Sequence, residues 1–220
     1  MGQIRITFSW KTTTALALRT GHASGGLDAM VRVRNGKPEI PGEAVKGAIR
    51  EAAERLLRWQ GKLSGREKDS SPWPPPSEQL RRIFASDLAQ HEGRPRVFYK
   101  FNAATGSTVR RLSVSSTAIE TSTGVARDET LRLLEYWSLG IDFNLSVDGR
   151  NGEWETGTRD YNDLLLLLAA IVSVTAVGGD QGTGNGQVSI PELAVAVDAT
   201  PKLVKNDIRL ELAKWTPEAQ

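Results

Sequence analysis

Two stretches of the sequence combine glycine with cations or backbone amides, which are the groups that hold phosphate. In PGEAVKGAIR (41–50) a Pro-Gly pair precedes a helical pattern, and the first-turn amides of a helix lack internal partners and attract anions. Lys46 and Arg50 lie four residues apart, so they share one helix face and can contact successive phosphates. An ordinary amphipathic helix with solvated cations remains the alternative interpretation.

The second stretch is the glycine-rich GGDQGTGNG (178–186). It lacks the Gly-Lys-Ser/Thr ending of a nucleotide-hydrolase phosphate loop, and Gly182, Gly184 and Gly186 miss the dinucleotide-binding fingerprint. Together with Gly179 these residues offer a flexible run of amides suited to a sugar-phosphate chain. A simple turn is the alternative, although five glycines in nine residues exceed what a turn needs.

Composition excludes several kinds of chemistry. The 220 residues contain no cysteine, which rules out disulfides and thiolate metal sites. His22 and His91 are the two histidines, too few for a histidine-rich metal cluster. The start of the chain alternates apolar and polar residues, and the apolar run 164–177 is shorter than the ~20 residues that cross a bilayer. We therefore expect a cytoplasmic protein with no membrane partner.

Charge is unevenly distributed along a chain whose net charge is only +2. Residues 1–50 contain eight Lys or Arg against three acids, and residues 81–111 contain seven against two. Residues 112–170 reverse the balance, with four bases and ten acids. Basic segments that the fold brings together would form a track for a polyanion, whereas scattered solvated charges are the alternative.

The pattern of apolar residues predicts alternating strands and helices. Residues 3–9 and 141–147 have the period of two of half-buried strands. Residues 43–60 form an amphipathic helix pattern, and residues 160–175 read as a buried helix. Further strands are expected at 15–19, 96–101, 131–134 and from about 187, and a short helix at 78–84. This order predicts an α+β, ferredoxin-like (RRM-like) palm as one domain over 1–220, with insertions at about 61–77 and 102–130.

Several of these features occur in the order of a known family. The chain resembles the RAMP superfamily of CRISPR proteins through Ile40-Pro-Gly-x-x-x-Lys-Gly-x-x-Arg50 and the glycine-rich loop up to Val188. Between them, Glu135, Gly140 and Phe143 match a Glu-x-x-x-x-Gly-x-x-Phe segment that follows the family's hairpin "thumb". The collinear matches run from Gly21 to Val188.

Within that superfamily the chain looks most like the backbone subunit of type III effector complexes, which coats the guide RNA and cuts target RNA. The resemblance makes Asp28 the catalytic residue, with cleavage dependent on a metal and driven by attack of the neighbouring ribose 2′-hydroxyl. A lone carboxylate can hold Mg²⁺, or another divalent cation, jointly with phosphate oxygens. It can also orient or deprotonate the hydroxyl. A turn residue after Gly25-Gly26 is the other reading of Asp28.

The resemblance also implies RNA contacts and partners. A thumb hairpin would separate duplex segments and expose one phosphodiester. The partners implied are guide RNA, target RNA, further copies of this chain and other CRISPR effector subunits. The RNA-binding residues expected are His22, Lys46, Arg50, Thr123, Arg127, Gly179, Gly182, Gly184 and Gly186.

Three alternatives stay open at this point. The same scaffold could cap the complex without catalysis, leaving Asp28 inert. It could instead process guide precursors, with His22 as general base, since histidine titrates near neutrality. A small-molecule enzyme whose glycine loop holds a nucleotide is the third.

Overall fold

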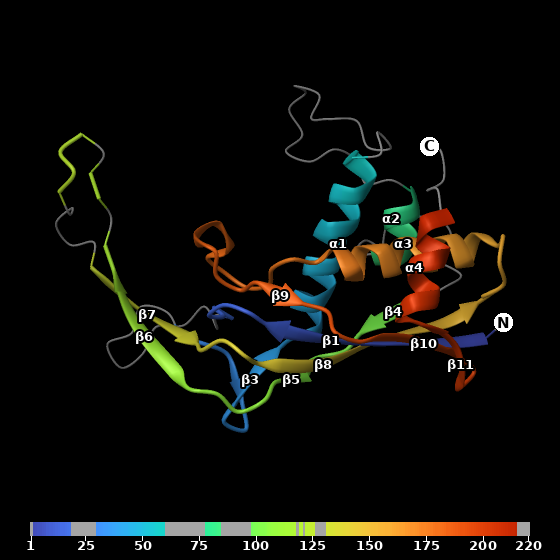
Figure 1. Cartoon of the computed structure of the whole chain (residues 1–220), viewed down its shortest axis with the longest axis horizontal. Coiled ribbons are helices and arrows are strands. Elements are labelled where there is room, and N and C mark those ends of the chain that lie inside the picture. Colours follow the sequence, from blue (N-terminus) through green and yellow to red (C-terminus); the bar gives the residue numbers. More distant parts are fainter. Residues whose placement is uncertain are drawn as a thin grey trace.

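One antiparallel sheet forms the centre of the molecule (Figure 1). The computed structural model describes residues 2–18, 30–59, 78–84, 98–117, 119–120, 122–125 and 131–214. Its main strands lie in the order β11 (Thr200–Val204), β10 (Leu193–Val197), β1 (Gly2–Thr12), β8 (Asp142–Gly152) and β4 (Phe98–Phe101). A short strand, β9 (Val188–Ser189), also pairs with β1.

Four helices lie on one face of this sheet (Figure 1). They are α1 (Gly42–Trp59), α2 (Glu78–Phe84), α3 (Arg159–Ser173) and α4 (Lys205–Lys214). The segments β1-α1-β4 and β8-α3-β10 each join two strands through a helix, and the four strands interleave as β10-β1-β8-β4. That interleaving is the split βαβ arrangement of ferredoxin-like folds. The predicted α+β, ferredoxin-like class is therefore confirmed.

The core lies between the sheet and the helices. Ile6, Phe8 and Trp10 of β1 are buried and pair in register with Val147, Leu145 and Phe143 of β8. Helix α3 contributes five consecutive buried leucines, 164–168, to the same core. Full burial of such a side chain contributes about 1.5–3 kcal/mol. Thr158 caps the start of α3, because its hydroxyl accepts from the Tyr161 amide at 3.2 Å and satisfies a first-turn donor.

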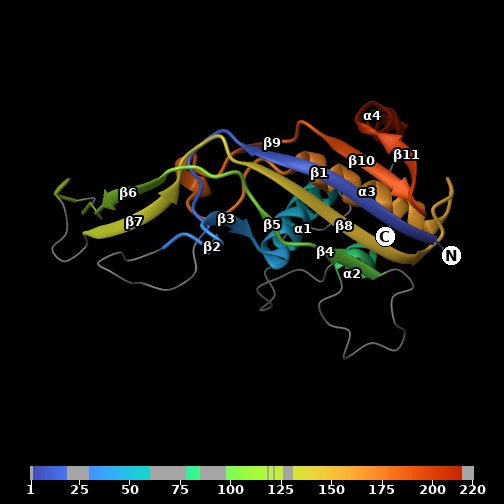
Figure 2. The same cartoon turned by 90° about the horizontal axis from the view of Figure 1, so that it is seen from below.

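Two smaller sheets extend from this core. In the first, β3 (Lys37–Ile40) pairs with β2 (Val33–Arg34) and with β5 (Ala104–Thr105). In the second, β6 (Arg111–Ser116) pairs with β7 (Arg132–Trp137). We call this second pair and its connection the thumb hairpin. Both views show it projecting from one end of the molecule, away from the main sheet (Figures 1 and 2).

The structure differs from the sequence expectations in three places. Of the strand expected at 15–19, the described residues 15–18 form only the isolated bridges Leu16–Trp137 and Ala17–Gly179, and residue 19 lies outside the described residues. The segment expected as a separate strand at 131–134 belongs to β7, so the hairpin spans Arg111–Trp137 and not 102–130. The β2–β3 hairpin and α4 were not predicted. The expected insertion 61–77 lies outside the described residues.

Within the described ranges, no helix is both long enough and apolar enough to span a lipid bilayer.

Candidate nucleic-acid interface

The root of the thumb hairpin is the point where the segments with predicted functions converge. Three consecutive residues of β7 make the contacts. The Glu135 carboxylate is buried and accepts from the Val31 amide at 3.0 Å. Tyr136 donates its hydroxyl to Asp180 at 2.6 Å, and Trp137 exchanges backbone hydrogen bonds of 2.9 Å with Leu16. One strand thus holds three distant parts of the chain.

Leu18 and Arg32, on either side of segment 19–29, lie beside this root. The Arg32 amide donates to the Leu18 carbonyl at 2.5 Å, so the chain leaves and re-enters the described structure at one place. The Trp137 indole also donates to the Arg32 carbonyl at 3.4 Å. His22 and Asp28 belong to segment 19–29 and, like Arg127, lie outside the described residues. Their predicted roles remain predictions.

The glycine loop, residues 178–186, lies on the other side of Leu16 and Ala17. Gly179 donates its amide to the Ala17 carbonyl at 2.7 Å, and Gly186 donates to the Ala15 carbonyl at 2.7 Å. Gly186 has φ +73°, and a Cβ placed there would lie 2.0 Å from the Val177 carbonyl oxygen. The expectation that all these amides are flexible and available is therefore wrong for Gly179 and Gly186, and also for Gly184, whose amide donates to Gln181.

Gly182 and Gly184 form the open part of the same loop. A Cβ at either position meets nothing within 4 Å. Gly184 has φ +84° and donates its amide to the Gln181 carbonyl at 3.0 Å. Open backbone at the tip, held by a fixed base, is what close approach of a sugar-phosphate chain requires.

Lys46 and Arg50 lie side by side on α1, as predicted from their spacing. Burial lowers the pKa of the half-buried Lys46 ammonium, and the positive charge of Arg50 lowers it further. No carboxylate among the described residues forms an ion pair with Lys46, whereas Arg50 donates to Glu54 at 2.9 Å. An anion beside Lys46 would favour its charged form. Arg50 is already partly neutralised.

Helix α1 is connected to the glycine loop through α3. The Arg55 guanidinium donates to the carbonyl of Ser173, the last residue of α3, at 2.8 Å. From Ser173 the chain continues through 174–177 into the glycine loop. That Lys46, Arg50 and the loop line one groove stays a prediction.

Gly42 explains why α1 can begin where it does. A Cβ at this position would lie 2.3 Å from the Phe101 carbonyl oxygen, so only glycine permits this close contact with the end of β4. Within the Pro41-Gly42 pair, Gly42 is thus required for packing.

Thr123 lies near the tip of the thumb hairpin and is exposed. Its hydroxyl donates to Glu120 at 3.1 Å and accepts from the Val125 amide at 3.3 Å. These bonds stabilise the local turn, in which Gly124 has φ +68°. RNA binding by Thr123 stays a prediction.

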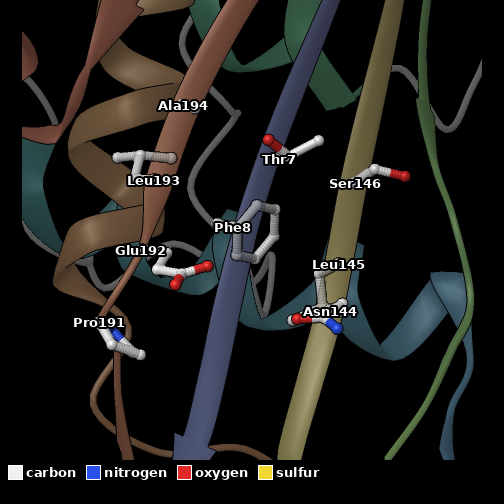
Figure 3. Close-up of a pocket in the computed structure, with 9 residues that line it drawn as sticks. All are labelled: Thr7, Phe8, Asn144, Leu145, Ser146, Pro191, Glu192, Leu193 and Ala194. Carbon is white, nitrogen blue, oxygen red and sulfur yellow. The ribbon is translucent and has the colours of Figure 1, made fainter.

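The uncovered face of the main sheet carries a shallow groove, which Figure 3 shows across β10, β1 and β8. Thr7, Asn144, Ser146, Glu192 and Ala194 are among its lining residues, which include no lysine or arginine. Sheets that bind RNA on their face do so by stacking bases on exposed aromatic side chains. Phe8, the one aromatic residue in this lining, is 3% exposed, so the groove offers neither stacking nor positive charge.

Sequence reasoning placed Glu135 in a family motif but did not predict the contacts that Glu135 and Tyr136 make. A carboxylate within the apolar strand RLLEYW was the available signal, because a buried acid must find donors. Arg111 provides a second partner for Glu135 at 3.3 Å, and its guanidinium lies 5.8 Å from the centroid of the Trp137 ring. These contacts fix the hairpin root.

Within the described ranges, no three His, Asp or Glu side chains come together in a way that could hold a metal ion. Binding of Mg²⁺ by Asp28 together with RNA phosphate oxygens stays a prediction.

Comparison with known proteins agrees with the geometry. The model of the RAMP superfamily matches residues 11–189 of the 220. That range begins in β1, includes α1 and the thumb hairpin, and ends in β9 just after the glycine loop. The curated proteins contain no match to this chain.

Proposed function

We propose that this chain is the backbone subunit of a type III effector complex. The proposal starts from its family: the chain belongs to the RAMP superfamily and is a CRISPR-associated RNA-binding subunit. As the backbone subunit it binds guide RNA and cuts the paired target RNA, using Asp28. It works in the cytoplasm with further copies of itself and other effector subunits.

The observation that carries the proposal is the convergence at the hairpin root. Leu18 and Arg32, which border the segment containing Asp28, are hydrogen-bonded to each other beside Trp137. The glycine loop joins the same root through Tyr136 and Asp180. A hairpin that separates duplex segments would thus present a phosphodiester close to the chain segment that bears the proposed catalytic carboxylate.

Sequence-independent RNA binding follows from the groups at this site. Lys46 and the open glycine backbone of residues 182 and 184 offer charge and close approach, but no pattern of donors that could read bases. Base pairing with the guide would then supply sequence specificity, and the affinity of the protein for RNA would fall with salt.

The cleavage step assigned to Asp28 needs no catalytic group from another protein. The ribose 2′-hydroxyl forms a bond to the adjacent phosphorus while the bond to the 5′-oxygen breaks. The leaving 5′-oxygen takes a proton from water, so the products are a 2′,3′-cyclic phosphate and a 5′-hydroxyl. The Asp28 carboxylate orients the 2′-hydroxyl and accepts its proton. A bound divalent cation would supply positive charge to the phosphate oxygens.

Exposed apolar side chains on the thumb hairpin support assembly with other subunits. Leu112 and Val114 lie on the same face of β6 and are 42% and 46% exposed. Exposed apolar residues gathered on one element favour contact with a partner.

The test compares Asp28→Asn with the unaltered chain in the assembled complex. We expect guide-dependent cleavage of target RNA to fall at least ~100-fold, the usual effect of removing a general base, while guide binding and assembly are retained. The cleaved ends should carry a cyclic phosphate. Unchanged cleavage by the variant would refute the assignment of Asp28.

Two other outcomes would favour the alternative functions. A complex that assembles but never cuts target RNA would identify a non-catalytic structural subunit. Cleavage of repeat RNA by the isolated protein, abolished by His22→Ala, would identify a guide-processing endoribonuclease.

A further inference from the structure

A hollow of about 320 Å³ lies between the β2–β3 hairpin and β5, apart from the groups assigned above. Its lining residues are Arg34, Asn35, Lys37, Ala103, Ala104 and Thr105. In Figure 1 this hairpin extends on the side of the main sheet opposite to α1 and α3.

The hairpin turn places two cations next to each other at the edge of this hollow. Asn35 and Gly36 have φ +51° and +76°, the left-handed pair of a two-residue type I′ turn. Arg34 and Lys37 flank that turn and pair directly in register. Like charges directly opposite one another destabilise a hairpin, and an anion in the hollow would remove that repulsion.

The available carboxylate does not balance these charges. Glu39 accepts from Arg32 at 3.0 Å and from Arg34 at 3.3 Å, so two guanidinium groups share one acid. The hydrogen bond from Arg32 is the main reason that the pKa of Glu39 is lowered. Among the described residues no carboxylate forms an ion pair with Lys37. The three cations Arg32, Arg34 and Lys37 face one carboxylate, Glu39, so the hairpin carries a net positive charge.

A polar track leads from the hollow to the thumb hairpin. Thr105 lines the hollow, and Ser107, Thr108 and Arg110 continue from it, all exposed, to the start of β6. The backbone of this track is fixed, because Gly106 donates to the Pro38 carbonyl at 2.8 Å and Ser138 donates to the Arg110 carbonyl at 2.9 Å. A fixed line of hydroxyl groups with cations at both ends matches a ribose-phosphate chain.

We propose that the hollow between β2–β3 and β5 binds a backbone phosphate of RNA, with Lys37 and Arg34 as its ligands. The proposal rests on the RNA-binding function proposed above and adds a second contact, at the β2–β3 hairpin. The phosphate could belong to the guide or to the target strand, and the two RNA arms of the test distinguish these sources.

The variant to test is Lys37→Glu, because the new carboxylate would attract Arg34 across the turn and keep the hairpin folded. Its matched control is Arg150→Glu, an equal change of charge at an exposed position in the part of β8 that pairs with β4. Lys37→Arg keeps the charge and should behave as the unaltered protein. Fluorescence anisotropy would measure affinity for a guide-length single strand and for a guide–target duplex over a series of salt concentrations.

We expect Lys37→Glu to weaken binding about five- to tenfold in at least one RNA arm. The slope of log affinity against log salt should become shallower by about one, the effect of losing one phosphate contact. A loss confined to the duplex assigns the phosphate to the target strand, and a loss with the single strand assigns it to the guide.

Affinities of Lys37→Glu and Arg150→Glu within twofold of each other in both arms would overturn the proposal. The proposal would also be overturned if Lys37→Glu bound RNA normally but failed to assemble with the other subunits. That result would identify an acidic protein surface as the occupant of the hollow. If the unaltered protein bound neither RNA, the proposed function itself would fail, and that outcome is distinct from the others.

Discussion

The three glycines at the end of the glycine loop provide a graded test of how backbone strain and RNA contact are divided. Gly182 has neither a left-handed backbone nor a neighbour that a Cβ would meet, Gly184 has φ +84° and open space, and Gly186 combines φ +73° with a contact to the Val177 carbonyl. Alanine at the three positions therefore adds nothing, strain alone, or strain with a clash.

The magnitudes follow from these contacts. A left-handed residue other than glycine costs about 1–2 kcal/mol, so Gly184→Ala should lower the free energy of unfolding by that amount. In Gly186→Ala the clash would also disturb the bonds from Val177 to Gly186 (2.8 Å) and from Gly186 to Ala15 (2.7 Å), each worth about 1 kcal/mol. We expect a total loss of about 3 kcal/mol for Gly186→Ala and less than about 0.5 kcal/mol for Gly182→Ala.

Urea denaturation of the three variants measures the stability series, and RNA-binding titrations measure the contact. Gly182→Ala should keep its stability but bind guide-length RNA several-fold more weakly, because its methyl group occupies the space that the RNA backbone needs. Equal stability of Gly182→Ala and Gly186→Ala would refute the close approach to Val177. Unchanged RNA affinity of Gly182→Ala would refute the role of the loop tip.

Two further predictions concern charged residues. Burial and Arg50 lower the pKa of Lys46, so the protein should bind RNA with full affinity below that pKa and more weakly as pH rises through it. The RNA affinity of Lys46→Arg should fall less over the same range. Identical pH profiles of the two proteins from neutral to alkaline pH would contradict this. Asp163 is 4% exposed and binds Arg82 through two hydrogen bonds of 2.6 and 2.7 Å. Asp163→Ala should therefore lower the free energy of unfolding, measured by urea denaturation, by about 3–5 kcal/mol. The RNA affinity of the folded protein should not change. A large loss of RNA affinity would contradict this and would indicate that Arg82, held by Asp163, contacts RNA.

Periodicity predicted the central elements because their burial is one-sided or complete. In β8, Phe143, Leu145 and Val147 alternate with polar residues because one face of the strand packs on the core and the other does not. Helix α3 was found from its unbroken apolar run, and α1 from its amphipathic pattern. These patterns also sufficed for the ferredoxin-like class, since strand and helix order leaves few ways to bury the apolar faces.

The thumb hairpin was harder to delimit from sequence. All six residues of β6 are exposed, so burial imposes no alternation on that strand, and its partner β7 resembles part of the core because Tyr136 and Trp137 are buried. The β2–β3 hairpin did carry a signal that was overlooked. Asn35-Gly36 between Arg34 and Lys37 is the residue pair that a type I′ turn favours.

The candidate site was predictable in its residue types but not in its connections. Spacing alone placed Lys46 and Arg50 on one face of α1, whereas the neutralisation of Arg50 by Glu54 depends on side-chain geometry. The contacts of Glu135 with Val31 and of Tyr136 with Asp180 join residues 104 and 44 positions apart. No local pattern encodes such distant pairs, because their partners are selected by the packing of the whole domain.

The exposure of β6 separates two properties that usually vary together. Apart from Arg111, which contacts Glu135 and Trp137, its exposed side chains contribute nothing to the interior. The neighbouring strand fastens the base of the hairpin through Glu135, Tyr136 and Trp137. The outer half of the hairpin can therefore be lengthened, shortened or recoded with little effect on folding. This makes it a suitable place to attach a spectroscopic label or to alter the spacing between neighbouring molecules in an assembly.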